Sequence, residues 1–179
     1  MSEEIKMNLG SSLVLAEVTK MLLYKKVKND KGEDVLVDRD LPFRLRYYLN
    51  KDKILFDRDV QRFNRDRLLI LAKYGEPDDS GDNVVIKDNE KMELFKKEIN
   101  DLIDLEITHP ISKLSVEDID LVKDTDLPIK PEVMNVFIHY LVDDPDLAAQ
   151  TEIGFDVKDL GEVKWLKKHI LRKWRIPFV

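Results

Sequence analysis

The stretch Lys73-Tyr74-Gly75-Glu76 lies in the middle of residues 41–114, the part of the chain that decides the fold. Before it, apolar residues recur at helical spacing from Leu45 to Tyr74, and after it an acidic glycine turn leads to a second amphipathic segment. Gly75 suits the left-handed position that ends a helix, and Pro77 cannot continue one. The pattern predicts a helix, a short β-hairpin and a second helix, with no obvious catalytic group among them.

The long helix is predicted to begin after Asp40, because this carboxylate can accept the free amide hydrogens of a first turn that contains Pro42. Its apolar stripe consists of Leu45, Leu49, Phe56, Val60, Phe63, Ile70 and Tyr74. This spacing implies a helix of about thirty residues, and it leaves open a kink or interruption between Asn50 and Lys53.

Shorter elements are predicted on both sides of this unit. The first is a helix that starts near Ser11 or Ser12, either of which can cap it, and runs to about Lys25. The others are a hairpin of 26–28 with 35–37, a strand at 84–86, a helix at 89–104 capped by Asn89, a strand at 105–114 confined to a sheet edge by Pro110, a helical turn at 115–118, a helix over 133–140 and a basic helix at 161–173. The predicted fold class is α+β and mainly helical, with the two hairpins meeting in a small antiparallel sheet. Residues 1–144 would form the body and residues 145–179 a C-terminal extension.

Composition limits the class of protein. With 179 residues, of which 43% are hydrophobic, the chain is long enough to bury the core of one domain. It has no cysteine, which excludes disulfides, thiolate chemistry and cysteine-ligated metal sites. No apolar run reaches the roughly 18 residues of a membrane helix, and Glu3 and Glu4 stand where a secretory signal carries cations. We therefore expect no contact with membranes and an intracellular site of synthesis.

Charge is unevenly distributed along the chain. The net charge is −6, yet the tail after Glu162 contains six cations and no acid. These cations are Lys164, Lys167, Lys168, Arg172, Lys173 and Arg175. Residues 1–163 therefore carry a net charge of −12, so any contact with nucleic acid would have to use the tail.

The tail also supplies the predicted partner-binding residues. They are Trp165, Lys167, Lys168, Arg172, Trp174 and Arg175. Tryptophan combined with arginine is typical of protein interfaces, and the same composition can stack on bases or lie on a membrane surface. We expect the tail to dock on the body or on a neighbouring subunit, with nucleic acid as the second alternative and a membrane as the last.

Motifs for catalysis and cofactor binding are missing from the sequence. A calcium loop centred on Gly81 would need a bidentate carboxylate at the position that Lys87 occupies, so a tight turn explains these residues better. The histidines His109, His139 and His169 fall on three different predicted elements, and no pair has the spacing of a zinc-binding helix. Neither a Gly-x-Ser-x-Gly elbow nor a glycine-rich phosphate loop is present. We therefore expect a protein that is not an enzyme and has no metal or cofactor.

Arginines along the long helix are a second candidate for binding, because guanidinium groups favour planar partners. They are Arg44, Arg46, Arg58, Arg62, Arg65 and Arg67. Asp57, Asp59 and Asp66 stand among them at helical spacing, so pairing within the helix is the favoured interpretation.

In its order of elements the chain resembles a small family of tailed-bacteriophage proteins of unknown function. The shared parts are an N-terminal amphipathic helix at 13–23, a Leu41-Pro42 start to a long charged helix, its Lys-Tyr-Gly-Glu end at 73–76, the acidic glycine turn at 78–81, a second helix at 92–102 and an extended segment leading to a helix at 106–140. The resemblance covers about residues 5 to 142 and leaves the basic tail unexplained. No activity is assigned to the family, so no catalytic residue carries over.

The resemblance implies a non-enzymatic phage protein that acts through protein–protein contacts, as a virion structural component or an assembly factor. Its partners would be other phage proteins or copies of itself in a multi-subunit complex, and it would be found in the virion or in the host cytoplasm. The alternative is a host-directed inhibitor, an anti-defence binder whose acidic body partly mimics nucleic-acid phosphates.

Overall fold

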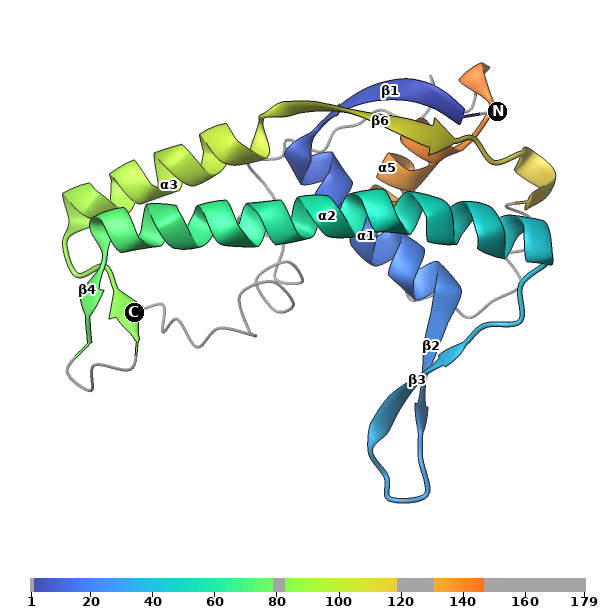
Figure 1. Ribbon diagram of the computed structural model, residues 1–179, viewed down its shortest axis with the longest axis horizontal. Coiled ribbons are helices and arrows are strands. Elements are labelled where there is room, and N and C mark those ends of the chain that lie inside the picture. Colours follow the sequence, from blue (N-terminus) through green and yellow to red (C-terminus); the bar gives the residue numbers. More distant parts are fainter. Residues whose placement is uncertain (1, 79–82, 119–130, 147–179) are drawn as a thin grey trace.

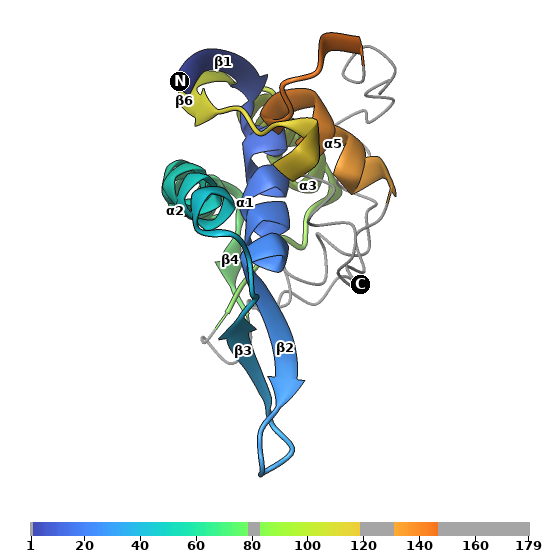
Figure 2. The same cartoon turned by 90° about the vertical axis from the view of Figure 1, so that its right-hand side faces the viewer.

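The computed structural model describes residues 2–78, 83–118 and 131–146, and within them the fold is α+β and mainly helical, as predicted (Figure 1). The central element is α1 (Leu9–Leu23), with α2 (Phe43–Tyr74) on one side and α5 (Pro131–Leu141) on the other (Figure 2). Twelve of the fifteen residues of α1 are buried, although the sequence was interpreted as an amphipathic helix here. A helix that is apolar almost all round has to be enclosed by its neighbours, and α1 is.

The start of α1 differs from the prediction. Asn8 is its N-cap, and the side chain of Asn8 accepts a hydrogen bond of 2.7 Å from the Ser11 amide. The hydroxyl of Ser12, the other predicted cap, donates to Asp59 on α2 instead. The polar side chains at the start of α1 therefore serve different tasks, one capping the helix and one joining two helices.

The long helix α2 contains 32 residues without a break, so no interruption occurs between Asn50 and Lys53. The predicted cap was wrong, because the N-cap is Pro42 and no side chain caps this end. Asp38 near this end binds the Arg46 guanidinium at 2.8 Å instead.

Gly75 ends α2 for a different reason from the predicted one. Its φ of −89° lies in the ordinary extended region, so the left-handed conformation is not used. A Cβ on Gly75 would lie 2.2 Å from Cγ1 of Val84 and 2.8 Å from the carbonyl oxygen of Leu71, both far too close. Glycine is required here because the backbone approaches the next strand closely.

The predicted hairpin between the two helices is present. Strand β4 (Glu76–Pro77) pairs antiparallel with β5 (Val84–Val85), and α3 (Asn89–Ile103) follows. The cap of α3 is Asp88, not Asn89, and its carboxylate accepts from the Glu90 and Lys91 amides. Thus α3 returns along α2, as Figure 1 shows.

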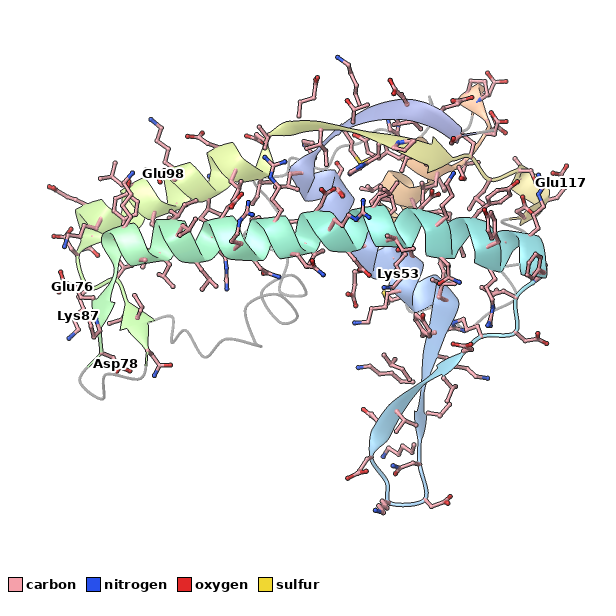
Figure 3. All side chains as sticks on the ribbon, in the orientation of Figure 1. Lys53, Glu76, Asp78, Lys87, Glu98 and Glu117 are labelled. Carbon is pink, nitrogen blue, oxygen red and sulfur yellow. The ribbon has the colours of Figure 1, made fainter. Side chains whose placement is uncertain are left out.

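Ion pairs at the hairpin end connect α2 with α3. Glu98 on α3 binds the Lys73 ammonium, and it accepts a hydrogen bond of 2.5 Å from the Tyr74 hydroxyl. Lys91 binds Glu76 at 2.9 Å, and both glutamates are labelled in Figure 3. Exposed pairs such as these contribute little stability.

In the described part of the chain the strands form three separate two-stranded sheets, which corrects the prediction that the two hairpins meet. The hairpin of β2 (Tyr24–Lys28) and β3 (Asp34–Asp38) projects away from the helices, on the same side of α2 as the β4–β5 hairpin (Figure 1). The third sheet pairs β6 (Glu106–Ser112), which was predicted, with β1 (Ser2–Asn8), which was not.

The last described segments agree with the prediction. Ser115 and Asp118 cap one helical turn reciprocally, each side-chain oxygen accepting from the other residue's amide at 3.2 Å. In α5, Val136 and Phe137 are buried against the core. The predicted basic helix at 161–173 lies outside the described residues.

Candidate functional site

A buried polar cluster joins α1, α2 and β6. Oδ2 of Asp59 on α2 accepts a hydrogen bond of 2.5 Å from the Ser12 hydroxyl on α1 and lies 2.5 Å from Nε2 of His109 on β6. The His109 ring also packs edge-on against Phe56, with 6.1 Å between the ring centroids. Burial acts to raise the pKa of Asp59, but hydrogen bonds from His109 and Ser12 hold it below its ordinary value. Asp59 is therefore a carboxylate that links three elements.

The order of these three groups does not suit nucleophilic catalysis. A catalytic serine needs the imidazole between its hydroxyl and the carboxylate, so that the ring can remove the proton. Here the carboxylate of Asp59 stands in the middle, and the serine and the histidine contact the same oxygen. Ser12 is also fully buried, where no substrate reaches it. The cluster therefore connects α1, α2 and β6 within the core.

A second carboxylate, Asp52, lies two turns earlier on the same face of α2 and is only 2% exposed. Its two oxygens accept from the Ser112 amide at 3.3 and 3.2 Å. The Lys51 ammonium donates to the Ser112 hydroxyl at 3.1 Å. Burial raises the pKa of Asp52 to about 6, against the opposing effects of Ser112, Lys51 and His109.

The raised pKa makes stability depend on pH in a defined window. Between pH 3.8 and about 6 the folded chain binds a proton at Asp52 that the unfolded chain has lost, so the free energy of unfolding falls as the pH rises through this range. Asp52→Asn keeps an acceptor for Ser112 without a charge. We expect it to raise the free energy of unfolding at pH 7.5 by on the order of 2 kcal/mol. The gain should disappear near pH 4, as measured by urea unfolding at both values.

Asp57→Asn is the matched control, because Asp57 lies on the same helix but forms a half-exposed pair with Lys53 at 2.5 Å. It should change stability little at either pH. An equal gain from Asp52→Asn at both pH values would show that the charge of Asp52 is not the cause.

The histidines do not come together in the described part of the chain. His109 is in the buried cluster on β6, His139 is on α5, and His169 lies outside the described residues. Among residues 2–78, 83–118 and 131–146, no three histidine, aspartate or glutamate side chains are grouped as a metal site would require. Within the same ranges, none of the helices combines the length and the apolar character needed to cross a bilayer.

The other candidate site is the side of α2 that points away from α1. We call it the outer face and define it by Phe43, Tyr47, Ile54, Leu68 and Leu69. Their exposed fractions are 85%, 57%, 57%, 40% and 65% in that order. The opposite side of α2 is buried at steps of three and four residues from Leu45 to Leu71. In Figure 2, where α2 is seen end-on, no described element covers the outer face.

The arginines of α2 are only partly paired within the helix. Asp66 binds Arg65 at 2.9 Å and lies 3.7 Å from Arg62, as the favoured interpretation requires. The other two aspartates do not serve this purpose, since Asp57 binds Lys53 and Asp59 is buried. Arg67 lies on the core side, where its Nε is buried without a hydrogen-bond partner and desolvation lowers its pKa.

Comparisons of this chain with protein-family models, with curated proteins and with solved structures found no match. The predicted partner-binding residues from Trp165 to Arg175 lie outside the described residues, so they stay a prediction. The outer face was not recognised from the sequence. Its signal was present in Phe43, Tyr47 and Ile54, which follow helical spacing but do not belong to the predicted core stripe.

Proposed function

We propose that this chain is a non-enzymatic bacteriophage protein that acts through contacts with other proteins, as a virion component or an assembly factor. The observation that carries the proposal is the outer face of α2, where five large apolar side chains are exposed along one helix. Exposed apolar side chains that share one side of a helix mark a surface that can bind the apolar stripe of a partner.

Two further features support a binding protein. The β2–β3 hairpin extends beyond the helical body and offers a projecting arm for contacts (Figure 1). The buried cluster around Asp59 ties α1, α2 and β6 into one frame, which keeps the outer face in a fixed shape. The assignment to a phage rests on the sequence resemblance over residues 5 to 142.

The test is the protein composition of the phage particles and of their assembly intermediates. We expect mass spectrometry of purified material to find this chain in one or the other, at a constant ratio to a known structural protein. A virion component would be present in the finished particle, whereas an assembly factor would be present only in the intermediates. Absence from both would overturn the proposal.

The acidic body favours a second candidate, a host-directed inhibitor. Residues 1–163 carry a net charge of −12, which suits a partial mimic of nucleic-acid phosphates. This candidate predicts that the chain is absent from particles and intermediates and instead purifies in a fixed ratio with one host protein that binds nucleic acid.

A further inference from the structure

The exposed side of α2 has a sequence repeat of seven residues. One line consists of Tyr47, Ile54, Gln61 and Leu68. A neighbouring line consists of Arg44, Lys51, Arg58 and Arg65. Seven residues are almost two helical turns, so each line stays on one side of the helix and drifts by only about 20° per repeat. An apolar line and a cationic line therefore run side by side along α2.

The structure leaves most of both lines accessible. Tyr47, Ile54 and Leu68 are exposed on the outer face, and Gln61 is exposed between them. Arg44, Arg58 and Arg65 are exposed as well, although Arg65 binds Asp66 at 2.9 Å, whereas Lys51 is half-buried beside Ser112. Together the two lines run from Arg44 to Leu68, which is roughly 36 Å at a rise of 1.5 Å per residue.

We propose that the outer face of α2 is a docking seam for an acidic amphipathic helix of another protein. The apolar stripe of that helix would cover Phe43, Tyr47, Ile54 and Leu68, and its glutamates or aspartates would pair with the cationic line. Coiled coils use the same two kinds of contact: the apolar positions bury surface between the helices, and the flanking charges select the partner. The inference rests on the proposed function and identifies the class of partner.

A second copy of α2 fits the seam poorly. In an antiparallel pair of helices the cationic line of one copy would face the same line of the other. In a parallel pair it would face the opposite flank, where Asp38 and Asp57 already pair with Arg46 and Lys53 and the flank carries no net negative charge. Like charges brought together at an interface oppose binding, so the charge pattern selects a partner of opposite sign.

Nucleic acid is also a poorer fit than an acidic helix. The apolar line through Ile54 and Leu68 would gain nothing from a phosphate backbone, and the negative charge of residues 1–163 repels one. Gln61 in the apolar line and Asn50 beside it limit the buried apolar area. We therefore expect a micromolar site with a defined register and not a permanent one.

The experiment uses the full chain and a fluorescein-labelled synthetic peptide of four heptads, with leucine at its apolar positions and glutamate at both flanks. A peptide with lysine at both flanks is its control. We expect fluorescence anisotropy to give an affinity at least tenfold higher for the glutamate peptide, and this difference should shrink as salt is added. Equal affinity for the two peptides would overturn the proposal.

Substitutions on α2 test whether the peptide binds there. Arg58→Glu/Arg65→Glu should weaken binding of the glutamate peptide at least tenfold. Lys96→Glu/Lys97→Glu changes the net charge equally on exposed positions of α3 and should weaken it less than twofold. Ile54→Asp tests the apolar line and should weaken binding as strongly as the arginine pair. Circular dichroism checks that each variant keeps its helices. Unchanged binding of the glutamate peptide by the arginine variant would show that the docking seam is not on α2.

Other occupants give different results. A single-stranded oligonucleotide that displaces the glutamate peptide with equal or higher affinity would overturn the assignment. A dimer of the chain that is observed by sedimentation and that Ile54→Asp dissociates would overturn it as well. A contact through the tail is also distinguishable. If Trp165→Ala/Trp174→Ala prevents incorporation into particles while Arg58→Glu/Arg65→Glu does not, the proposed function stands and the seam is wrong.

Discussion

Asp59→Ala is expected to lower the free energy of unfolding by about 3 kcal/mol, because it leaves a buried hydroxyl and a half-buried imidazole without their shared acceptor. The Ser12 hydroxyl is fully buried and has Asp59 as its hydrogen-bond partner, and the His109 ring lies in the same cluster. Three elements meet at this carboxylate, so its loss should loosen α1, α2 and β6 together. Urea unfolding followed by circular dichroism measures the change.

Asp57→Ala is the control for this experiment, since it removes an aspartate two residues away that forms a half-exposed pair with Lys53. It should change the free energy of unfolding by less than about 0.5 kcal/mol. Ser12→Ala should cost less in the Asp59→Ala background than in the unchanged protein, by at least about 0.5 kcal/mol, because the two residues share one interaction. Additive effects would show that the hydrogen bond contributes nothing.

Features that depend on neighbouring residues were predicted correctly from the sequence. The helix over residues 43–74, the hairpin after Gly75 and the helix that follows are all present. The helical turn at 115–118 also forms as expected, and Ser115 and Asp118 cap it reciprocally. Spacing and turn chemistry act over a few residues, so a single sequence contains the information. Cap positions shifted by one to a few residues, which is the usual uncertainty at helix ends.

Features that depend on distant residues were missed. Strand β1 pairs with β6, and the ion pair between Lys6 on β1 and Glu106 on β6 joins residues that are 100 positions apart. Ser12 was interpreted as a helix cap, but its partner Asp59 is 47 residues away. Asp59 itself was assigned to a charged surface. A buried carboxylate on a helix with charges on several sides cannot be told from an exposed one until its neighbours are known.

The two faces of α2 were only partly separated by the sequence. Leu45, Leu49, Phe56 and Phe63 of the predicted stripe are buried, whereas Val60, Ile70 and Tyr74 are half-buried. The core side also contains Asp52, Asp59 and Arg67, and the outer face contains Phe43, Tyr47 and Ile54. With polar residues inside and apolar residues outside, the contrast between the faces is too small to identify the outer face as a binding surface.

Phe56 and Ile54 test this division directly, because they stand two residues apart on one helix and point to opposite sides. Phe56 is 0% exposed and Ile54 is 57% exposed. Phe56→Ala should lower the free energy of unfolding by about 3 to 5 kcal/mol, since it opens a cavity in the core and removes the ring against which His109 packs. Urea unfolding of the purified variant gives this value.

Ile54→Ala is the matched control and should cost less than about 1 kcal/mol, because the side chain is already largely in water. It should nevertheless weaken binding of the glutamate-flanked peptide. The expected result is thus that an apolar side chain on one side of α2 stabilises the fold while its neighbour on the other side contributes to recognition. Equal losses of stability from the two substitutions would mean that the outer face packs against something within the protein, and the docking seam would then have no free surface to act through.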